Sequence, residues 1–391
     1  MKIRSALQRS AIAGTAVLAT SGSVFAFTGV ASASKPHAAS PYVVGVSEPE
    51  TGAEAQAGTE IYDGERLAAN KINAAGGVLG HKIVLKEEDD ACDPQTSVNA
   101  ANKLVSLGVQ AQVGGYCSSA AQPAEPIYSR AKIPNIQAAA NSATLTQAGY
   151  HNVFLVDPNG VPESKAAASF FTKVLKVKKL LIVDDQSTYA VSIARLTAAA
   201  LKGTSTEALP IQAVPDTTQD FTAIVNTARS DGATGIYWTG YFAQGAEFVR
   251  QLRSAGLNIP FTGADGSVDP TFIKDAGADA TGTYATIAVL TSFLTGSAAK
   301  AFDSGYTKAF HSQPGPYSAY GYDAMYALAH AAKNAGSLAG PKVIAALHKV
   351  KFSGLTGEVS FAANGTRVGA HFVIVEVKHG TYVLAPHQPP A

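Results

Sequence analysis

A cysteine and two serines lie between an apolar run and a helix-like segment at residues 113–128, which read VGGYCSSAAQPAEPIY. Three kinds of site use these residue types: a serine nucleophile, a phosphate cradle, and a small-anion site beside a disulfide. Pro123 fits the first turn of the helix, where a missing N–H is harmless. The N–H groups near Ser118 to Ala120 would then point out of the helix and, with its dipole and a serine hydroxyl, suit a carboxylate. The alternative is that Ser118 or Ser119 simply caps the helix.

The enzymatic interpretations lack the other residues that they need. No G-x-S-x-G elbow surrounds a serine, and no histidine stands in a recognisable partner context. The phosphate-binding patterns G-x-x-x-x-G-K-[ST] and G-x-G-x-x-G do not occur in the sequence. The nine histidines are scattered, and neither cysteine has metal-ligand spacing. The sequence therefore predicts a binding protein with no catalytic residue, no metal and no cofactor.

An anion site for a zwitterion needs a cation site nearby. Asp265 directly follows the strand-like IPFTGA and could pair with an ammonium group, although an Asp before Gly266 also favours a plain turn. Tyr241, after WTG, and Tyr317, in GPYSAY, are aromatic loop residues that could line the same site or simply pack.

The two cysteines each follow a strand-like segment. Cys92 comes after a segment ending DDA, and Cys117 after one ending VGG. In an exported protein two cysteines are expected to pair. If the two strands are parallel neighbours, both cysteines lie at one sheet edge, and their disulfide would close a loop of 26 residues. Such a bond contributes about 3 kcal/mol and would hold the Ser118 loop in place.

Residues 1–33 have the pattern of an export signal. A positively charged start precedes a weakly apolar stretch, and Ala-Ser-Ala at the end predicts cleavage after Ala33. The alternative is an uncleaved membrane anchor. We expect residues 34–41 to be a disordered spacer. No cysteine precedes Cys92, so the sequence lacks a lipoprotein cysteine, and we expect a periplasmic, cell-surface or extracellular protein.

Length and charge set the broad class. A chain cleaved after Ala33 would keep 391 − 33 = 358 residues, which indicates two domains. The formal net charge is +1, with no long run of charge, and this argues against a nucleic-acid partner.

Strand-like and helix-like segments alternate along most of the chain, which is typical of α/β proteins with parallel sheets. The expected strands are 42–47, 81–90, 109–114, 133–137, 178–185, 232–240 and 258–265, with a hairpin at 371–385 around His379-Gly380. The expected helices are 56–75, 95–107, 124–130, 161–175, 190–202, 221–231, 243–255, 297–310, 320–334 and 341–350.

Ligands of open parallel sheets lie at the carboxyl ends of strands, where loops lead into helices. Five such loops carry polar or aromatic groups, and function is expected there. They are 48–58, 116–120, 139–146, 240–245 and 264–269.

The stretch from EEDDACDP to TQAGY, residues 87–150, strongly resembles the leucine/isoleucine/valine-binding proteins of branched-chain amino-acid ABC transporters. The resemblance runs from YVVGV at 42–46 to AGADATGTY at 276–284 and GPYSAYGYDAMYAL at 315–328. The combination of DDACDP and CSS at this spacing is a specific signature of that family.

The resemblance implies the type I periplasmic-binding-protein fold. This is an α/β fold of two doubly wound lobes with parallel sheets, joined by a three-stranded hinge, and the lobes close on ligand. We expect lobe 1 to comprise 42–158 plus 289–366, and lobe 2 to comprise 159–288 plus 367–391.

The resemblance also implies roles for individual residues. The family's disulfide falls on Cys92 and Cys117, and its carboxylate-binding serine falls on Ser118. The segment that supplies backbone groups and a hydroxyl to the amino acid falls on Ala139, Ala140 and Asn141.

In the second half of the chain, the tyrosine of the family's GYY motif falls on Tyr241. The acidic residue that pairs with the ligand ammonium falls on Asp265. The tyrosine of the GPY motif falls on Tyr317.

Several positions depart from the family pattern. Asn141 stands where the family usually has Thr, and a two-residue shift would instead align Ser142 to Thr144 with that motif. Asp265 is one methylene shorter than the family's Glu. In the side-chain pocket, Ala57 replaces an aromatic residue and Tyr116 replaces a leucine. The sequence thus predicts a retained α-amino-acid site with an altered side-chain pocket.

These features predict an exported, monomeric solute-binding protein of an ABC importer, with a membrane permease as partner. It would bind a free amino acid between its lobes, other than leucine, isoleucine or valine, with an aromatic or polar side chain favoured. No reaction is expected. Two alternatives stay open: a ligand-sensing binding protein for an amide or related small solute, and a secreted serine hydrolase using Ser118.

Overall fold

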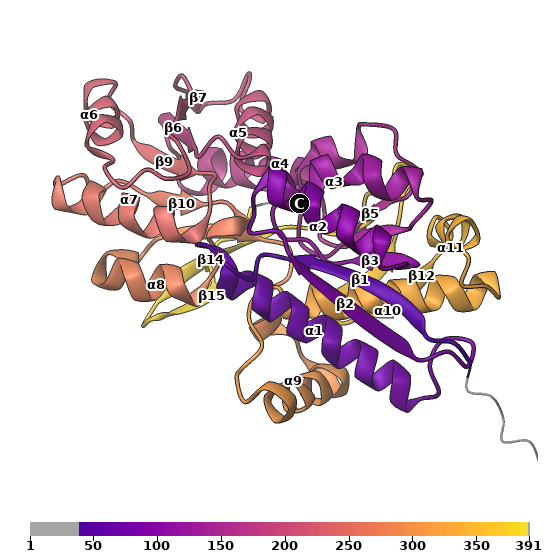
Figure 1. Ribbon diagram of the computed structural model, residues 1–391. Helices are drawn as coiled ribbons and strands as arrows, with labels where there is room; N and C mark the ends of the chain where they lie inside the picture. Colours follow the sequence, from indigo (N-terminus) through magenta and orange to yellow (C-terminus); the bar gives the residue numbers. More distant parts are fainter. Residues whose placement is uncertain (1–38, 390–391) are drawn as a thin grey trace, which may run out of the picture. The chain divides into compact units, whose positions relative to one another are not determined.

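The computed structural model describes residues 39–389 (Figure 1). The predicted export signal and the spacer residues up to 38 lie outside this part. Within it, the strands form two large sheets and one small two-stranded sheet.

The first sheet has five parallel strands in the order β2-β1-β3-β4-β5. β1 contributes Tyr42, Val44 and Val46, which are fully buried, as expected for a strand with helices on both faces. The strands β2 and β3 precede the two cysteines, and the sequence analysis considered them as possible neighbours. They are not adjacent, because β1 lies between them. The strands are β1 (Tyr42–Glu48), β2 (Ile83–Asp89), β3 (Ala111–Val113), β4 (Asn135–Gln137) and β5 (Val153–Leu155).

Helices from both ends of the chain cover this sheet. α1 packs against α10, and Gly64 allows the close approach, because a Cβ there would lie 2.0 Å from the carbonyl oxygen of Ser318. α2 packs against α3 and begins at a capping Asp93, whose carboxylate accepts from the Thr96 N–H at 2.7 Å. The helices are α1 (Ala55–Ala74), α2 (Pro94–Ser106), α3 (Ser118–Arg130), α9 (Gly296–Phe310), α10 (Ser318–Ala335) and α11 (Gly340–Leu347).

The second sheet has eight strands, in the order β15-β14-β11-β10-β9-β6-β7, with β8 also paired to β6. β14 and β15 form the predicted antiparallel hairpin, and His379 and Gly380 at its turn both have positive φ. The other pairings, apart from β11 with β14, are parallel. The strands are β6 (Lys179–Asp184), β7 (Glu207–Ala208), β8 (Gln212–Ala213), β9 (Gly235–Trp238), β10 (Phe261–Gly263), β11 (Tyr284–Ile287), β14 (Val373–Lys378) and β15 (Thr381–Leu384).

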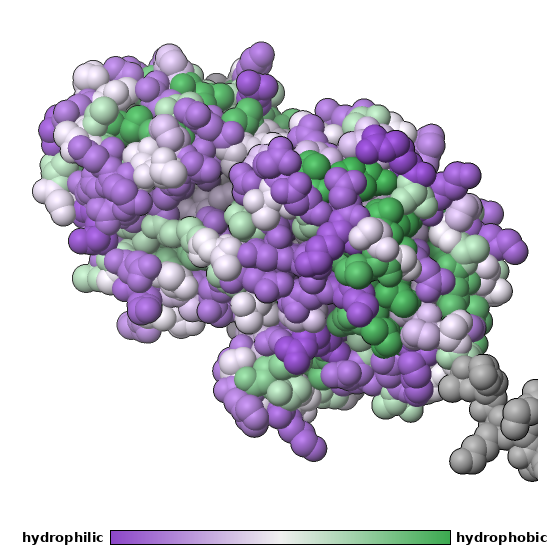
Figure 2. Space-filling model, in the orientation of Figure 1, coloured by the Kyte–Doolittle hydropathy of each residue, from purple (hydrophilic) through white to green (hydrophobic). Residues whose placement is uncertain are grey.

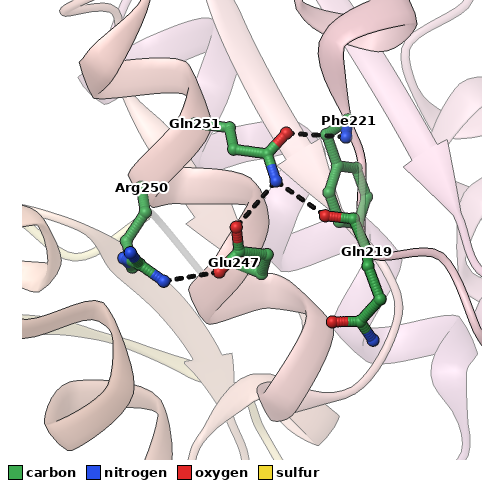
Figure 3. Close-up of polar contacts among 5 residues, drawn as sticks. All are labelled: Gln219, Phe221, Glu247, Arg250 and Gln251. Carbon is green, nitrogen blue, oxygen red and sulfur yellow. Dashed lines mark hydrogen bonds and ion pairs between the residues drawn. The ribbon is translucent and has the colours of Figure 1, made fainter.

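Five helices accompany the second sheet. They are α4 (Gly160–Ser169), which continues into a π-helical turn at Phe170–Val174, α5 (Thr188–Ala200), α6 (Thr222–Ser230), α7 (Phe242–Ser254) and α8 (Pro270–Ala276). Side chains on α7 fix the start of α6 (Figure 3). Gln251 accepts from the Phe221 N–H and donates to the Gln219 carbonyl, both at 2.7 Å, and Glu247 holds the amide of Gln251 and the guanidinium of Arg250.

The chain crosses between the two sheets three times: after β5, after β11, and after the small hairpin of β12 (Lys351–Gly354) and β13 (Gly357–Ser360). Arg367 ties two of these crossings together, since its guanidinium donates to the Val156 carbonyl at 2.9 Å and to the Thr356 carbonyl at 2.7 Å. The predicted two-lobed fold with a three-stranded hinge is confirmed. The exact lobe boundaries stay a prediction.

The face shown in Figure 2 is mainly hydrophilic. A few large apolar side chains are exposed, namely Leu79, Val84, Leu107, Val368 and Leu384. Among residues 39–389, no helix combines the length and the apolar character needed to cross a membrane.

Candidate functional site

Both sheets have the doubly wound strand order, which fixes where a ligand can lie. In each sheet, one strand lies between two strands that come later in the chain. β1 lies between β2 and β3, and β6 lies between β7 and β9. At such a switch point the following loops diverge and leave a crevice at the carboxyl ends of the strands. The loops after β1, β3, β6 and β9 therefore form the candidate site.

The disulfide lies at the first switch point. Cys92 and Cys117 are bonded, with their Cα atoms 5.2 Å apart, as predicted. Cys117 is the N-cap of α3, so the helix begins at Ser118. The N–H groups of Ser118 and Ser119 have no acceptor within the helix and lie at the edge of this crevice, whereas the Ala120 N–H donates to the Cys117 carbonyl at 3.1 Å.

The expected start of α3 was wrong. We placed Pro123 in the first turn, but five helical residues precede it, and Pro126 follows inside the helix as well. Prolines at these positions remove intrahelical hydrogen bonds. Tertiary packing against α2 offsets this loss, and the longer helix brings its N-terminus to Ser118.

The loop after β4 is held against the start of α3. The N–H groups of Ala139 and Ala140 both donate to the Gly115 carbonyl, at 3.0 and 2.9 Å. The Ser118 hydroxyl accepts from the Ser142 N–H at 3.1 Å, and both serines are fully buried. The Ser118 hydroxyl can therefore still donate its own hydrogen to another acceptor.

Asn141 reaches across to the second lobe. Its side-chain amide donates to Oδ2 of Asp265 at 2.7 Å, while its Oδ1 has no partner in the described part of the chain. Ser142 instead bonds Thr144 and the Thr188 carbonyl, at 3.0 and 3.3 Å. Two alignments of this loop with the family motif were left open. The unshifted alignment selects Asn141, whose side chain contacts Asp265.

Asp265 is 2% exposed and lies at the centre of a dense network. The Tyr189 hydroxyl donates to its Oδ1 at 2.5 Å, and the Tyr317 hydroxyl donates to its carbonyl oxygen. Its N–H donates to Oε1 of Glu163 at 2.9 Å. The carboxylate is therefore fixed at the carboxyl end of β10 with its orientation set from both lobes.

Other acids surround this carboxylate. Burial raises the pKa of Asp265 to about 6, although hydrogen bonds from Tyr189 and Asn141 lower it. Burial also raises the pKa of Asp157 and of Glu163 well above the ordinary value, and the charge of Asp265 raises both further. With a pKa of about 6, Asp265 is mainly ionised at neutral pH, and burial favours the protonated forms of the two acids beside it.

Tyrosines separate Asp265 from solvent. The ring of Tyr116 lies 5.4 Å from the rings of both Tyr241 and Tyr317, and the Tyr189 and Tyr241 rings are 5.2 Å apart. All four are nearly fully buried. The Tyr241 hydroxyl has no partner among residues 39–389. Ala57 is fully buried in α1.

A cavity of about 460 Å³ lies between the two switch points, outside this group of tyrosines. Its lining comes from both sheets and includes the disulfide, Ser119, Asp185 and Tyr241. Two further contacts join the lobes at its margin. The Thr188 N–H donates to the Ser119 hydroxyl at 3.0 Å, and the Ala143 N–H donates to the Ser192 hydroxyl at 3.3 Å.

The sequence analysis missed Tyr189, Glu163 and Asp157. Tyr189 could have been found, because it follows the buried strand KKLLIVDD just as Asp265 follows IPFTGA. Glu163 and Asp157 lie near the first crossing between sheets, and nothing in their local sequence marks them as buried. Across residues 39–389, no group of three or more His, Cys, Asp or Glu residues could hold a metal ion.

Two doubly wound lobes, with a cavity between their switch points, define a two-lobed binding protein of the type I periplasmic-binding-protein fold. The chain belongs to the periplasmic binding protein family, whose model matches residues 41–381.

Named relatives agree with this assignment. An amino acid binding protein of Pseudomonas aeruginosa is 34% identical over 242 residues, which are 62% of this chain and 65% of that protein. A Leu/Ile/Val-binding protein of Citrobacter freundii is 33% identical over 236 residues, which are 60% of this chain and 64% of the relative. The chain thus spans just under two thirds of the length of the curated relatives it matches. A crystal structure of the leucine binding protein LivK from Thermotoga maritima superposes with a TM-score of 0.82 at 25% identity, covering 89% of this chain and 99% of that one.

Proposed function

We propose that this chain is the exported solute-binding protein of an ABC importer and binds a free amino acid between its lobes. The observation that carries the proposal is Asp265, an ionised carboxylate fixed in a buried site, to which no Lys or Arg within residues 39–389 donates a hydrogen bond. A buried charge without a counter-ion is costly, and a ligand ammonium would supply one.

The other end of the ligand fits the first lobe. The start of α3 offers N–H groups, a favourable helix dipole and the Ser118 hydroxyl to a carboxylate. Asn141, Ala139 and Ala140 form the adjoining loop, and Tyr241 and Tyr317 cover the ligand. Opposite charges fixed at the two ends reject solutes that lack either group, because the unused partner would stay buried and unpaired.

The side-chain pocket is proposed to lie by Ala57 and Tyr116. Replacing an aromatic side chain with a methyl group opens space on one side, and Tyr116 can stack on a ring or bond a polar tip. The preferred ligand is therefore proposed to differ from leucine, isoleucine and valine. A membrane permease, a monomeric state and a place in the periplasm or at the cell surface belong to the same proposal.

The alternatives are weaker. A serine hydrolase needs a base beside its nucleophile, whereas the Ser118 hydroxyl accepts a backbone N–H and has no histidine among its partners in residues 39–389. A sensor for a neutral amide would leave the charge of Asp265 without a counter-ion.

Mass spectrometry of the mildly purified protein, followed by calorimetry with the twenty amino acids, tests the proposal. We expect one retained amino acid per chain and saturable binding of that compound. The absence of saturable heat with every amino acid, together with tight binding of a neutral amide, would overturn it.

A further inference from the structure

The charged side chains that line the cavity between the switch points are all acidic. Three of its lining side chains are carboxylates: Glu54 before α1, Asp185 after β6, and Asp216 after β8. None of its lining residues is Lys, Arg or His. No ion pair within residues 39–389 involves any of the three acids.

Of these carboxylates, Asp185 is held in place by hydrogen bonds, whereas Asp216 is exposed. Asp185 is 1% exposed and accepts from the N–H groups of Ser187 at 2.9 Å and of Tyr241 at 3.3 Å. Asp216 lies on the segment between β8 and α6, whose far end is tied to α7 through Gln251 (Figure 3). The acids therefore belong to anchored segments of the second lobe.

Glu54 faces them from the first lobe. It precedes α1, but its carboxylate does not cap the helix. It is half-buried, and no side chain or neighbouring N–H donates to it in the described residues. Burial, together with the charges of Asp185 and Asp216, raises the pKa of Glu54 to about 7, although its own backbone N–H lowers it. A positive group in the cavity would remove this repulsion.

Two of the residues that line the cavity also have a buried polar atom without a partner in the described part of the chain. Tyr241 and Gln244 line the cavity and are 8% and 9% exposed. The Tyr241 hydroxyl and the Gln244 Nε2 have no hydrogen-bond partner within residues 39–389. Buried polar atoms are normally paired, so these two are poised for groups that a ligand would bring.

Asp265 does not line the cavity, but a chain of residue contacts links the cavity to the proposed ammonium site. Tyr241 lines the cavity, its ring contacts the Tyr189 ring, and the Tyr189 hydroxyl donates to Asp265. One flexible chain passing over the tyrosine rings could therefore reach Asp265 with one end and Glu54 with the other. Methylene groups pack well on such rings, and a terminal cation is attracted to them.

We infer that the transported amino acid has a cationic side chain, as in lysine, ornithine or arginine, and that Glu54, Asp185 and Asp216 form the subsite for its terminal charge. The inference rests on the proposed function, because it places the α-amino-acid group at Asp265 and Ser118.

Titration calorimetry with two matched ligand pairs tests the inference. Citrulline has nearly the shape of arginine without its charge, and norleucine resembles lysine without its ammonium group. We expect arginine or lysine to bind more tightly than its neutral counterpart by roughly tenfold or more, as for a partly buried charge pair. Equal affinity for charged and neutral members of both pairs would refute the subsite.

A variant tests whether the difference in affinity between charged and neutral ligands arises in the cavity. Glu54→Gln keeps the side-chain shape and removes the charge, so the affinity ratio of arginine to citrulline should fall severalfold. Asp220→Asn is the matched control, because Asp220 is exposed on the same segment as Asp216 and does not line the cavity. An unchanged ratio in Glu54→Gln, or an equal fall in Asp220→Asn, would overturn the role of Glu54.

The outcomes separate the inference from the proposed function. If citrulline binds at least as tightly as arginine and norleucine at least as tightly as lysine, and this binding is lost in Asp265→Ala, the binding of a free amino acid stands and the cationic subsite is wrong. If no amino acid binds at all, both are wrong.

Discussion

The single residue on which the proposed site depends most is Asp265. Replacing it with alanine removes the carboxylate that would pair with the ligand ammonium, while Asn141 and Tyr189 lose their acceptor. Breaking a buried charge pair at one partner costs about 3–5 kcal/mol, so the affinity for the amino acid should fall at least about a hundredfold. Calorimetry measures the loss, and circular dichroism checks that the fold is kept. A loss below about tenfold would reject this role.

The ionisation of Asp265 predicts a pH dependence of binding. Because its pKa is raised to about 6, the carboxyl takes up a proton as the pH falls through that value, and a protonated acid cannot pair with an ammonium group. The dissociation constant should therefore rise about tenfold per pH unit below about pH 6 and be constant above about pH 7. Burial also raises the pKa of the neighbouring acids Asp157 and Glu163 well above the ordinary value, which favours their protonated forms.

Calorimetry between about pH 5 and about pH 8 checks this expectation. The Glu54→Gln background is preferred, because the pKa of Glu54 is about 7 and its titration would overlap that of Asp265. Equal affinity at both ends of the range would contradict the expectation.

At the residue scale, sequence identified the positions that the structure gathers around Asp265. Asn141, Tyr241 and Tyr317 were found through the family resemblance, and each lies within one or two contacts of that carboxylate. Tyr189 was missed, although it also follows a buried strand, as Asp265 does. Burial of Glu163 and Asp157 could not be predicted, because it results from the way in which the crossings bring distant segments together.

At the element scale, long periodic segments were predicted well and short ones poorly. α1 and α2 agree with expectation to within one residue at each end. The three-residue strand β5 and the four-residue strand β11 were missed, because such short segments are too short to show a hydrophobic period. The early start of α3 was also missed, because its two prolines argue locally against a helix that tertiary packing stabilises.

The disulfide links two of these elements, and its removal should be measurable. Replacing both Cys92 and Cys117 with serine removes the covalent link between the loop after β2 and the start of α3. The free energy of unfolding should fall by about 3 kcal/mol, as the unfolded chain regains the freedom of the closed loop. Denaturant unfolding measures the change, and reductant-treated wild type is the control. An unchanged midpoint would show that the bond contributes no stability.

At the scale of the whole molecule, the fold buries several acids that form no ion pair within residues 39–389. Burial raises the pKa of Glu48, Glu65, Asp157 and Glu163 well above the ordinary value. It also raises the pKa of Glu125 to about 9 and that of Glu60 to about 8. These acids are distributed over both lobes, so their protonation concerns the whole chain rather than the site alone.

This distribution predicts how stability depends on pH. Above about pH 4.5 an unfolded chain releases these protons, whereas the folded chain retains them until the raised pKa of each group is reached. The folded state then binds more protons than the unfolded state, so the free energy of unfolding falls as the pH rises from about 4.5 toward about 9. The midpoint of thermal unfolding should be several degrees higher near pH 5 than near pH 8.

One residue allows a sharper test of this dependence. Glu125 lies fully buried in α3, and neither of its carboxyl oxygens has a partner within residues 39–389. Glu125→Gln keeps the shape and removes the proton, so the fall in the unfolding midpoint between about pH 5 and about pH 8 should become smaller. Glu207→Gln, at an exposed position of β7, is the matched control and should keep the full fall. A midpoint that rises with pH in the wild type, or an equal fall in both variants, would contradict the assignment of protonated buried acids.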